Sequence, residues 1–440
     1  MILNQHHKDL LSTLINQLWR LISGPLTMVL IPLYLSSVFQ GYWYLFISLS
    51  ALTVFADLGF SNIVMQFSAH EFAFLSFNDK GVLVGDDLHI KKMGSLLRFI
   101  LKRISLIILI TFPVIYIVGI WFFQRDSVTD VLIFPWTIYA IGSLINFFNY
   151  SILSFIEGMN KIQVIENTKL IVSVVNTVVI ALVLLVGGNI YALAVGSLVG
   201  GSLIFVLFLG KFKSLLRQLL KASVNYQYDW NKEILPLFIR YALSFASGYF
   251  IFSIYTPLMQ YYAGPIESGK VGITLTLIMA IFSLSNIWIY TITPQMNILV
   301  SQKNFKELNR LFKKRLLFSA STYLFILGCL ILFYHFLKDF WVIPRIVSRF
   351  LSLTSIAMLV LCYFFQLLVN SWATYLRAFK KELYMVPSII LAFWVLFTTA
   401  FAGYYLKPEY FFIGFLSSYL WWLPLSFFIY KQFKNCINEQ

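Results

Sequence analysis

The chain has 440 residues, of which 60% are hydrophobic and only 12% are charged. A soluble domain carries about 25% charged residues, so this composition excludes an ordinary soluble protein and predicts an all-α polytopic membrane protein. The formal net charge of +15 could indicate nucleic-acid binding, but the Lys and Arg residues are distributed between apolar segments along the whole chain. We therefore expect no nucleic-acid partner. We interpret the charge as a topology signal that also favours anionic membrane lipids.

Twelve apolar segments are long enough to cross a bilayer, which requires about 20 helical residues. They lie near residues 10–38, 42–66, 104–123, 132–155, 168–187, 190–210, 236–262, 270–293, 315–336, 350–373, 384–405 and 410–430. Most of the 33 Lys and Arg residues fall at the two termini and in the connections that follow even-numbered segments. Cytoplasmic loops carry such an excess, so both termini are predicted to be cytoplasmic.

Two polar stretches punctuate this pattern. Residues 211–235 combine basic residues with leucines at helical spacing, which predicts a cytoplasmic amphipathic linker between an N-terminal six-helix bundle (1–210) and a C-terminal one (236–440). The connection at 68–103 leads into a similar stripe at 93–109, which predicts a helix lying on the membrane surface before the third segment.

The first segment contains Arg20, Pro25 and Pro32. Arg20 is ten residues past the start of the segment, or about 15 Å into a helix. The prolines can break or bend the helix, and transporters tolerate such breaks where a helix lines a cavity. Arg20 is therefore a candidate cavity-lining phosphate ligand; the alternative is an arginine that snorkels to the interface or pairs with an aspartate.

The second segment carries one carboxylate, Asp57, which is followed by Leu58 and Gly59. A charge inside an apolar segment is a functional-site hypothesis by default, here ion coupling or gating. The alternative is that Asp57 lies near the helix end, where it is wetted or paired with a lysine, because polar residues follow within two turns.

The second half holds further candidates. Arg240 lies in the first turns of the seventh segment, where a lipid headgroup contact or a cavity role is possible, and Pro257 in the same segment predicts a helix break. Lys270 opens the eighth segment on the outer side. It is either an interfacial anchor or an anion contact at the outer mouth.

Catalytic signatures are missing from the sequence. We find no phosphate-binding glycine loop, no nucleophile elbow and no outer loop large enough for a pair of catalytic acids. His70, Glu71 and His89 lack the spacing of a metal site and are predicted to be solvated loop residues. We therefore expect a carrier, not an enzyme, with no catalytic residues, no metal and no cofactor.

Several stretches resemble the polysaccharide flippases of the multidrug/oligosaccharidyl-lipid/polysaccharide exporter superfamily. They are GYWYLF at 41–46, the Asp57-Leu58-Gly59 triplet, Arg20 in a proline-containing first segment, WNKEILPLFIR at 230–240 and KNFKELNRLFKK at 303–314. The resemblance extends along the chain and includes the twelve-segment count. It implies two six-helix bundles around a central cavity, which rock between inward-open and outward-open states.

The same resemblance implies the cargo, a polyprenyl-diphosphate-linked oligosaccharide such as an O-antigen repeat unit carried across the bacterial inner membrane. Arg20, and more weakly Arg240 and Lys270, match the cations expected to hold the diphosphate. Asp57 would couple a proton or sodium ion. A polysaccharide polymerase and chain-length machinery are possible partners. The alternatives are a multidrug or metabolite exporter of the same superfamily, or a membrane-embedded polysaccharide polymerase.

Overall fold

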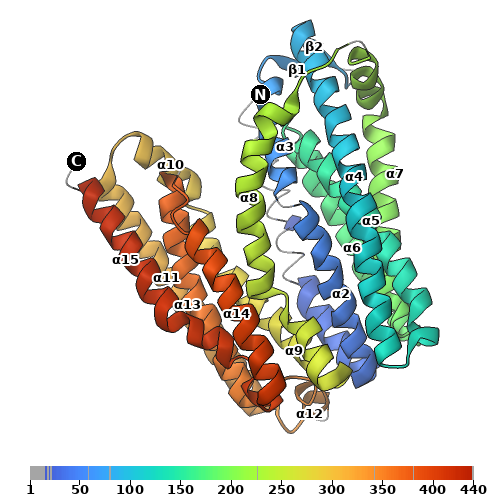
Figure 1. Ribbon diagram of the computed structural model, residues 1–440, viewed down its shortest axis with the longest axis vertical. Helices are drawn as coiled ribbons and strands as arrows, with labels where there is room; N and C mark the ends of the chain where they lie inside the picture. Colours follow the sequence, from blue (N-terminus) through green and yellow to red (C-terminus); the bar gives the residue numbers. More distant parts are fainter. Residues whose placement is uncertain are drawn as a thin grey trace. The chain divides into compact units, whose positions relative to one another are not determined.

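The computed structural model describes residues 15–16, 19, 22–57, 59–78, 81–224, 226–340, 342–379 and 381–438. These residues form long helices that are joined by short turns (Figure 1). The elements are a helix at Ile22–Tyr34, α2 (Ser37–Asp57), α3 (Phe60–Phe72), β1 (Leu75–Phe77), β2 (Leu83–Gly85), α4 (Asp87–Arg125), α5 (Thr129–Glu157), α6 (Ile162–Leu185), α7 (Tyr191–Ala222), α8 (Trp230–Phe252), α9 (Tyr255–Tyr290), α10 (Thr293–Ser301), α11 (Phe305–Leu337), α12 (Val342–Val347), α13 (Leu353–Ala378), α14 (Met385–Tyr405), a 3-10 turn at Pro408–Tyr410, and α15 (Ile413–Asn438).

The prediction of an all-α polytopic membrane protein is confirmed. Within the described part of the chain, nine helical stretches are long and apolar enough to cross a membrane, and Ile22–Tyr34 is a shorter apolar helix. Each of the twelve predicted segments contains a described helix. Many large apolar side chains on these helices remain exposed, as expected when lipid replaces water around the protein.

The chain divides into two compact units. Unit 1 consists of Met1–Leu35 and Phe46–Ala246, and unit 2 consists of Ser36–Leu45 and Ser247–Gln440. The start of α2 and the end of α8 thus belong to unit 2, whereas the rest of each helix belongs to unit 1. The bundle limits at 210 and 236 stay a prediction; in the structure, residues 211–222 simply continue α7.

In unit 1, α5 packs against α3, α4, α6 and α7. Two asparagines on α5 bind the α7 backbone: Asn149 donates to the carbonyl oxygen of Gly201 at 2.8 Å, and Asn146 donates to that of Ser197 at 3.2 Å. Gly142 lies against the backbone of Ser197 and Leu198, so that any side chain there would clash. These bonds satisfy buried amides and fix α5 and α7 side by side.

The predicted surface-lying helix at 93–109 is wrong. Instead, α4 is continuous from Asp87 to Arg125, and Met93, Leu97 and Ile104 are buried in the core of unit 1. A side chain at Gly94 would overlap the carbonyl oxygen of Leu219 on α7. The apolar stripes of the two helices therefore cover each other, which removes the need for either to lie on the membrane.

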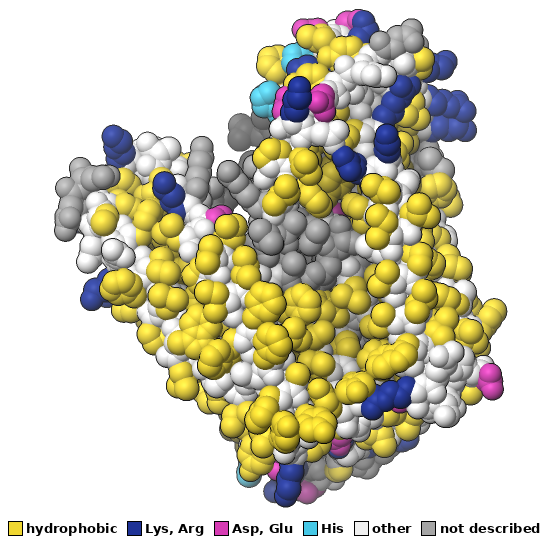
Figure 2. Space-filling model, viewed as in Figure 1, with side chains coloured by type: hydrophobic (Ala, Val, Ile, Leu, Met, Phe, Trp, Pro, Cys, Tyr) yellow, Lys and Arg dark blue, Asp and Glu magenta, His cyan; other side chains and the backbone are white. Residues whose placement is uncertain are grey.

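One end of unit 1 carries the two-stranded antiparallel sheet, in which Leu75 pairs with Gly85 and Phe77 with Leu83. Gln218 of α7 extends this sheet, because its side chain accepts from Leu83 N at 2.8 Å and donates to Leu83 O at 2.7 Å. Lys and Arg side chains gather over this end, above helices covered by hydrophobic side chains (Figure 2). We call it the cationic end of unit 1; it comprises the sheet, the first turns of α4 and the last turns of α7.

The core of unit 2 is built from α9, α11, α13 and α15, with the α14 helix packed on α15. Tyr255, Tyr363 and Phe415 form its aromatic centre, with ring centroids 5.5 Å apart for Tyr255–Phe415 and 6.2 Å apart for Tyr363–Phe415. The α9 helix contains a kink at Gly264, whose φ of 82° is a left-handed conformation that glycine adopts without strain. This kink separates the seventh and eighth predicted segments.

Candidate functional site

The predicted second segment is interrupted at Asp57. The α2 helix ends there, and α3 starts after Gly59, whose φ is 80°. The Asp57 carboxylate accepts hydrogen bonds from Ser61 Oγ at 2.7 Å and from Ser61 N at 3.2 Å. Ser61 Oγ also lies 3.3 Å from Ser151 Oγ of α5. Asp57 is therefore a part-buried carboxylate at a helix break, held by groups from α3 and, through Ser61, from α5.

A lysine partner for Asp57 was the alternative expectation. Within the described ranges, no Lys or Arg forms an ion pair with Asp57. Its bonds instead come from the backbone and hydroxyl of Ser61. Asp57 does lie at a helix end, as the same alternative expected. This position is also compatible with a carboxylate that exchanges an ion.

A second polar cluster of unit 1 joins α5 and α6 with Asn16. Lys169 of α6 lies 2.9 Å from Glu166 Oε1 and 3.4 Å from Glu157 Oε2, at the end of α5. The other oxygen of Glu166 accepts a hydrogen bond from Asn16 Nδ2 at 2.8 Å. The Glu166 side chain is 13% exposed and the Lys169 side chain 25% exposed. With both glutamates ionised and Lys169 protonated, the cluster carries a net negative charge.

Sequence reasoning missed this cluster. The fifth segment was expected to begin at residue 168, which leaves Glu166 outside it. A usable signal was present, because Glu166 and Lys169 are three residues apart and therefore neighbours on one helix face. The contributions of Asn16 and Glu157 could not be read from spacing, since Glu157 lies on α5 and Asn16 lies 150 residues before Glu166 in the chain.

Of the three predicted diphosphate ligands, the structure describes the side chain of Lys270 alone. Arg20 lies outside the described residues, and the side chain of Arg240, on α8, also lies outside them. Lys270 is described: its Nζ lies 2.7 Å from Oε1 of Glu267, one turn earlier on α9. That ion pair partly neutralises Lys270, which makes it a weaker anion ligand than the sequence suggested.

The prolines also differ from one another. Neither Pro25 nor Pro32 interrupts the helix at Ile22–Tyr34, which ends two residues after Pro32. Pro257 is buried and follows the gap between α8 and α9 at Ser253–Ile254. A proline ring clashes with the carbonyl of the residue four positions earlier, here Ser253, which accounts for the position of that gap.

The prediction of solvated loop residues is wrong for Glu71, which lies in α3 and is only 5% exposed, and for His89, which lies in α4 with its side chain 16% exposed. Its Oε2 lies 2.7 Å from His89 Nδ1, and its Oε1 lies 3.7 Å from Lys92 Nζ. His89 also stacks on Phe74, with 4.1 Å between ring centroids. These contacts lock the start of α4 onto the end of α3. Across the described residues, no cluster of His, Cys, Asp and Glu is suited to hold a metal ion.

No family model and no curated protein matches the sequence. The structure, however, is similar to solved transporters over nearly its whole length. One is an inward-facing multidrug resistance MATE family transporter of the MOP superfamily, with 15% identity, a TM-score of 0.64, and an alignment covering 97% of this chain and 96% of that chain. An outward-facing transporter of the same description has 14% identity, a TM-score of 0.58, and coverage of 99% and 96%.

A third structure, MATE in the straight conformation, gives 15% identity, a TM-score of 0.54, and coverage of 98% of this chain and 95% of that chain. The chain has the fold of the MATE transporters. At these identities the MATE likeness establishes the architecture alone. Within this fold, Asp57 and the cluster of Glu157, Glu166 and Lys169 are two charged sites at the ends of described helices of unit 1.

Proposed function

We propose that this protein is a transporter that moves a polyprenyl-diphosphate-linked oligosaccharide across the bacterial inner membrane by alternating access, with both termini in the cytoplasm. The observation that carries the proposal is the MATE fold along 97% of the chain. The cargo rests on the sequence resemblance to polysaccharide flippases. An O-antigen or another surface polysaccharide repeat unit is the expected glycan.

The physical requirement of this cargo supports a cationic site. A diphosphate and a chain of hydroxyls cannot cross hydrocarbon unaided, because each unpaired polar group costs several kcal/mol there. Arginine forms charge-assisted bidentate bonds with phosphate oxygens, which replace their hydration. We assign the diphosphate to Arg20 first and to Arg240 second. Lys270 ranks third, because Glu267 already pairs with it.

Turnover in one direction needs a driving force. We propose that Asp57 takes up a proton or a sodium ion in one state and releases it in the other. The net negative cluster around Lys169 is a second place in unit 1 where protonation could shift the balance between states. The exported lipid-linked glycan would then serve a polysaccharide polymerase and its chain-length machinery on the outer face.

A multidrug or metabolite exporter is the second candidate. Two observations favour it: the MATE transporters above are described as multidrug resistance proteins, and the net negative cluster in unit 1 suits a cationic compound. The two candidates differ in the sign of charge that the transport site must hold. They therefore predict opposite effects of removing Arg20.

The deciding experiment measures surface exposure of lipid-linked oligosaccharide in a strain whose only flippase is this protein. Wild type is compared with Arg20→Ala and with the exposed-cation control Arg310→Ala on α11, at matched protein levels. Export by wild type and by the control, with loss in Arg20→Ala, supports the flippase. If wild type fails to export glycan and the strain becomes more resistant to cationic drugs, the flippase proposal is wrong and the multidrug exporter is favoured.

A further inference from the structure

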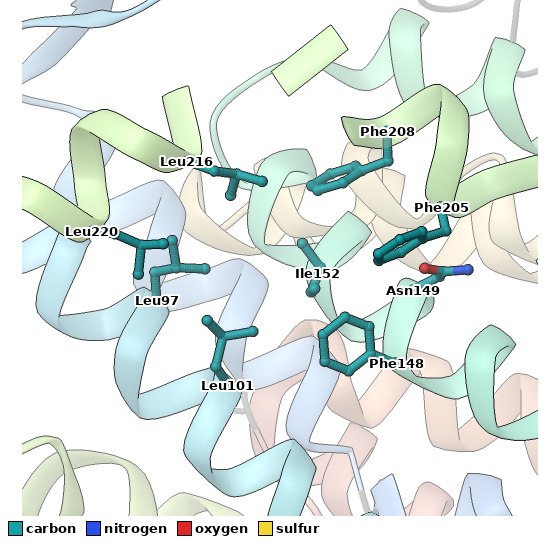
Figure 3. Close-up of a pocket in the computed structure, with 9 residues that line it drawn as sticks. All are labelled: Leu97, Leu101, Phe148, Asn149, Ile152, Phe205, Phe208, Leu216 and Leu220. Atoms are coloured by element: carbon teal, nitrogen blue, oxygen red, sulfur yellow. The ribbon is translucent and has the colours of Figure 1, made fainter. Parts of the chain in front are cut away.

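A groove in unit 1 lies between α4, α5 and α7 (Figure 3). Its cavity has a volume of about 150 Å³. The lining side chains are apolar with one exception, and they are Leu97, Leu101, Phe148, Asn149, Ile152, Phe205, Phe208, Leu216 and Leu220. The groove is therefore formed by side chains of three packed helices and is not a gap at a chain end.

Water is a poor occupant of this cavity. The exception in the lining, Asn149, already donates its amide to the Gly201 carbonyl oxygen at 2.8 Å. A buried water needs two to four polar partners, and apolar cavities stay dry and take up apolar ligands. The lining thus favours a hydrocarbon.

The groove is exposed at its two ends. Its floor is buried, since Leu97 is 1% exposed and Ile152 is 7% exposed, whereas Phe205 and Leu220 at its two ends are 42% and 37% exposed. Fifteen helical residues separate these two, which corresponds to about 22 Å. That length is more than half of the roughly 30 Å hydrocarbon core, so the groove suits an extended acyl chain that enters from one leaflet.

Cations border one end of this groove, at the cationic end of unit 1. Lys213 and Arg217 stand three residues before Leu216 and Leu220 on α7, which places them beside the apolar stripe. Lys102 follows Leu101 on α4, and Arg98 donates to the Leu220 carbonyl oxygen at 2.8 Å. Of the acidic residues in the described ranges, none pairs with Lys102, Lys213 or Arg217.

We propose that this groove binds an anionic phospholipid of the surrounding bilayer. One acyl chain lies along Leu97, Leu101 and Phe148 toward Phe205, and the phosphate lies among Lys213, Arg217 and Lys102. The cations exclude a preference for uncharged or zwitterionic headgroups, because each Lys or Arg near an anionic surface adds attraction that a zwitterion does not offer. The bound lipid would fill the α4–α7 side of unit 1, and this site does not depend on which cargo the protein carries.

The test uses the purified full-length protein and native mass spectrometry with added phosphatidylglycerol or phosphatidylcholine. We expect wild type to bind its first phosphatidylglycerol about tenfold more tightly than phosphatidylcholine. The double variant Lys213→Gln/Arg217→Gln should lose that preference, whereas Lys306→Gln/Arg310→Gln on α11 should keep it. Leu216→Trp, which fills the groove, should weaken binding of both lipids, and Leu324→Trp on the exposed face of α11 should not.

Equal affinity of wild type for the two lipids would overturn the proposal. Unchanged lipid binding in Lys213→Gln/Arg217→Gln would also overturn it, because both positions are exposed and the substitutions leave the core intact. A competition arm separates the two sources of a lipid phosphate. If a polyprenyl phosphate displaces phosphatidylglycerol at equal or lower concentration, the groove belongs to the tail of the cargo and the assignment to a bilayer lipid is wrong.

Discussion

The Asp57 carboxylate supplies the helix cap that Gly59 cannot. Gly59 occupies the N-cap position of α3 and has no side chain, and Asp57 accepts the hydrogen bond of Ser61 N, the second residue of α3, at 3.2 Å. An N-cap side chain normally makes this bond and contributes about 1 kcal/mol. Asp57 therefore has a structural role in addition to the ion-coupling role that we propose for it.

The two roles of Asp57 are separable by substitution. Asp57→Asn keeps a side-chain oxygen that can accept from Ser61 but removes the charge, so thermal stability in detergent should change little. Asp57→Ala removes the cap and should destabilise the protein by about 1 kcal/mol. Ion-dependent transport should be lost in both. Retention of transport and of its ion dependence in a stable Asp57→Asn protein would eliminate the coupling role.

The start of α2 should tolerate no side chain at Gly41. In unit 2, a Cβ on Gly41 would overlap the carbonyl group of Pro265 on α9, and Gln40 Nε2 donates to the Gly269 carbonyl oxygen at 3.0 Å beside it. We expect Gly41→Ala to cost roughly 1–3 kcal/mol through overpacking, measured as a lower thermal midpoint in detergent.

Gly328→Ala is the matched control for Gly41→Ala. It lies in α11 of the same unit, and a Cβ there would meet nothing within 4 Å. Because alanine is the better helix former, this variant should be as stable as wild type or up to about 1 kcal/mol more stable. Similar midpoints for the two variants would show that the close approach of α2 and α9 is absent in solution.

Removing the cation from the cluster in unit 1 should leave two glutamates facing each other. Lys169→Met is expected to destabilise the protein by roughly 1–3 kcal/mol, less than a fully buried pair because the Lys169 side chain is 25% exposed. Adding Glu166→Gln should recover part of the loss. Lys431→Met, at an exposed position of α15, is the control. A Lys169→Met midpoint equal to that of this control would contradict the cluster.

The contact between α7 and the sheet should be visible by hydrogen exchange. Gln218→Ala leaves both the N–H and the C=O of Leu83 without their partners, which are the side-chain atoms at 2.8 and 2.7 Å. An unpaired part-buried group costs about 1–3 kcal/mol, so exchange in residues 75–85 should accelerate roughly tenfold or more. Gln432→Ala on α15 should leave it unchanged. Equal exchange rates in the two variants would refute this contact.

Helix positions were readable from the sequence because lipid imposes long apolar runs, and every predicted segment contains a described helix. The helix break after Asp57 could not be predicted from the sequence, because the apolar run continues through it from 42 to 66. What marks the break is the left-handed conformation of Gly59. Glycine permits that conformation without requiring it.

The amphipathic stripes at 93–109 and 211–221 illustrate a different limit. An apolar stripe indicates that one face of the helix is buried, but it does not show whether lipid or another helix buries it. The sequence predicted a membrane-surface helix for 93–109 and a cytoplasmic amphipathic linker for 211–235. In the structure, Gly94 packs against the Leu219 carbonyl, and Leu97 and Leu215 are buried. The cluster of Glu157 and Lys169 escaped prediction for a related reason, since its members meet only when α5 and α6 are folded.

The assignment of Ser36–Leu45 to unit 2 has a consequence for dividing the chain. If the protein is cut between α7 and α8, the C-terminal fragment lacks the helix start that packs on Gly269, and the N-terminal fragment lacks Trp230, whose indole binds Ser95 of α4. Each fragment is thus missing a piece held by the other. Fragment complementation is therefore the expected behaviour: the halves should be unstable when produced separately and recover together, because each completes the core of its counterpart.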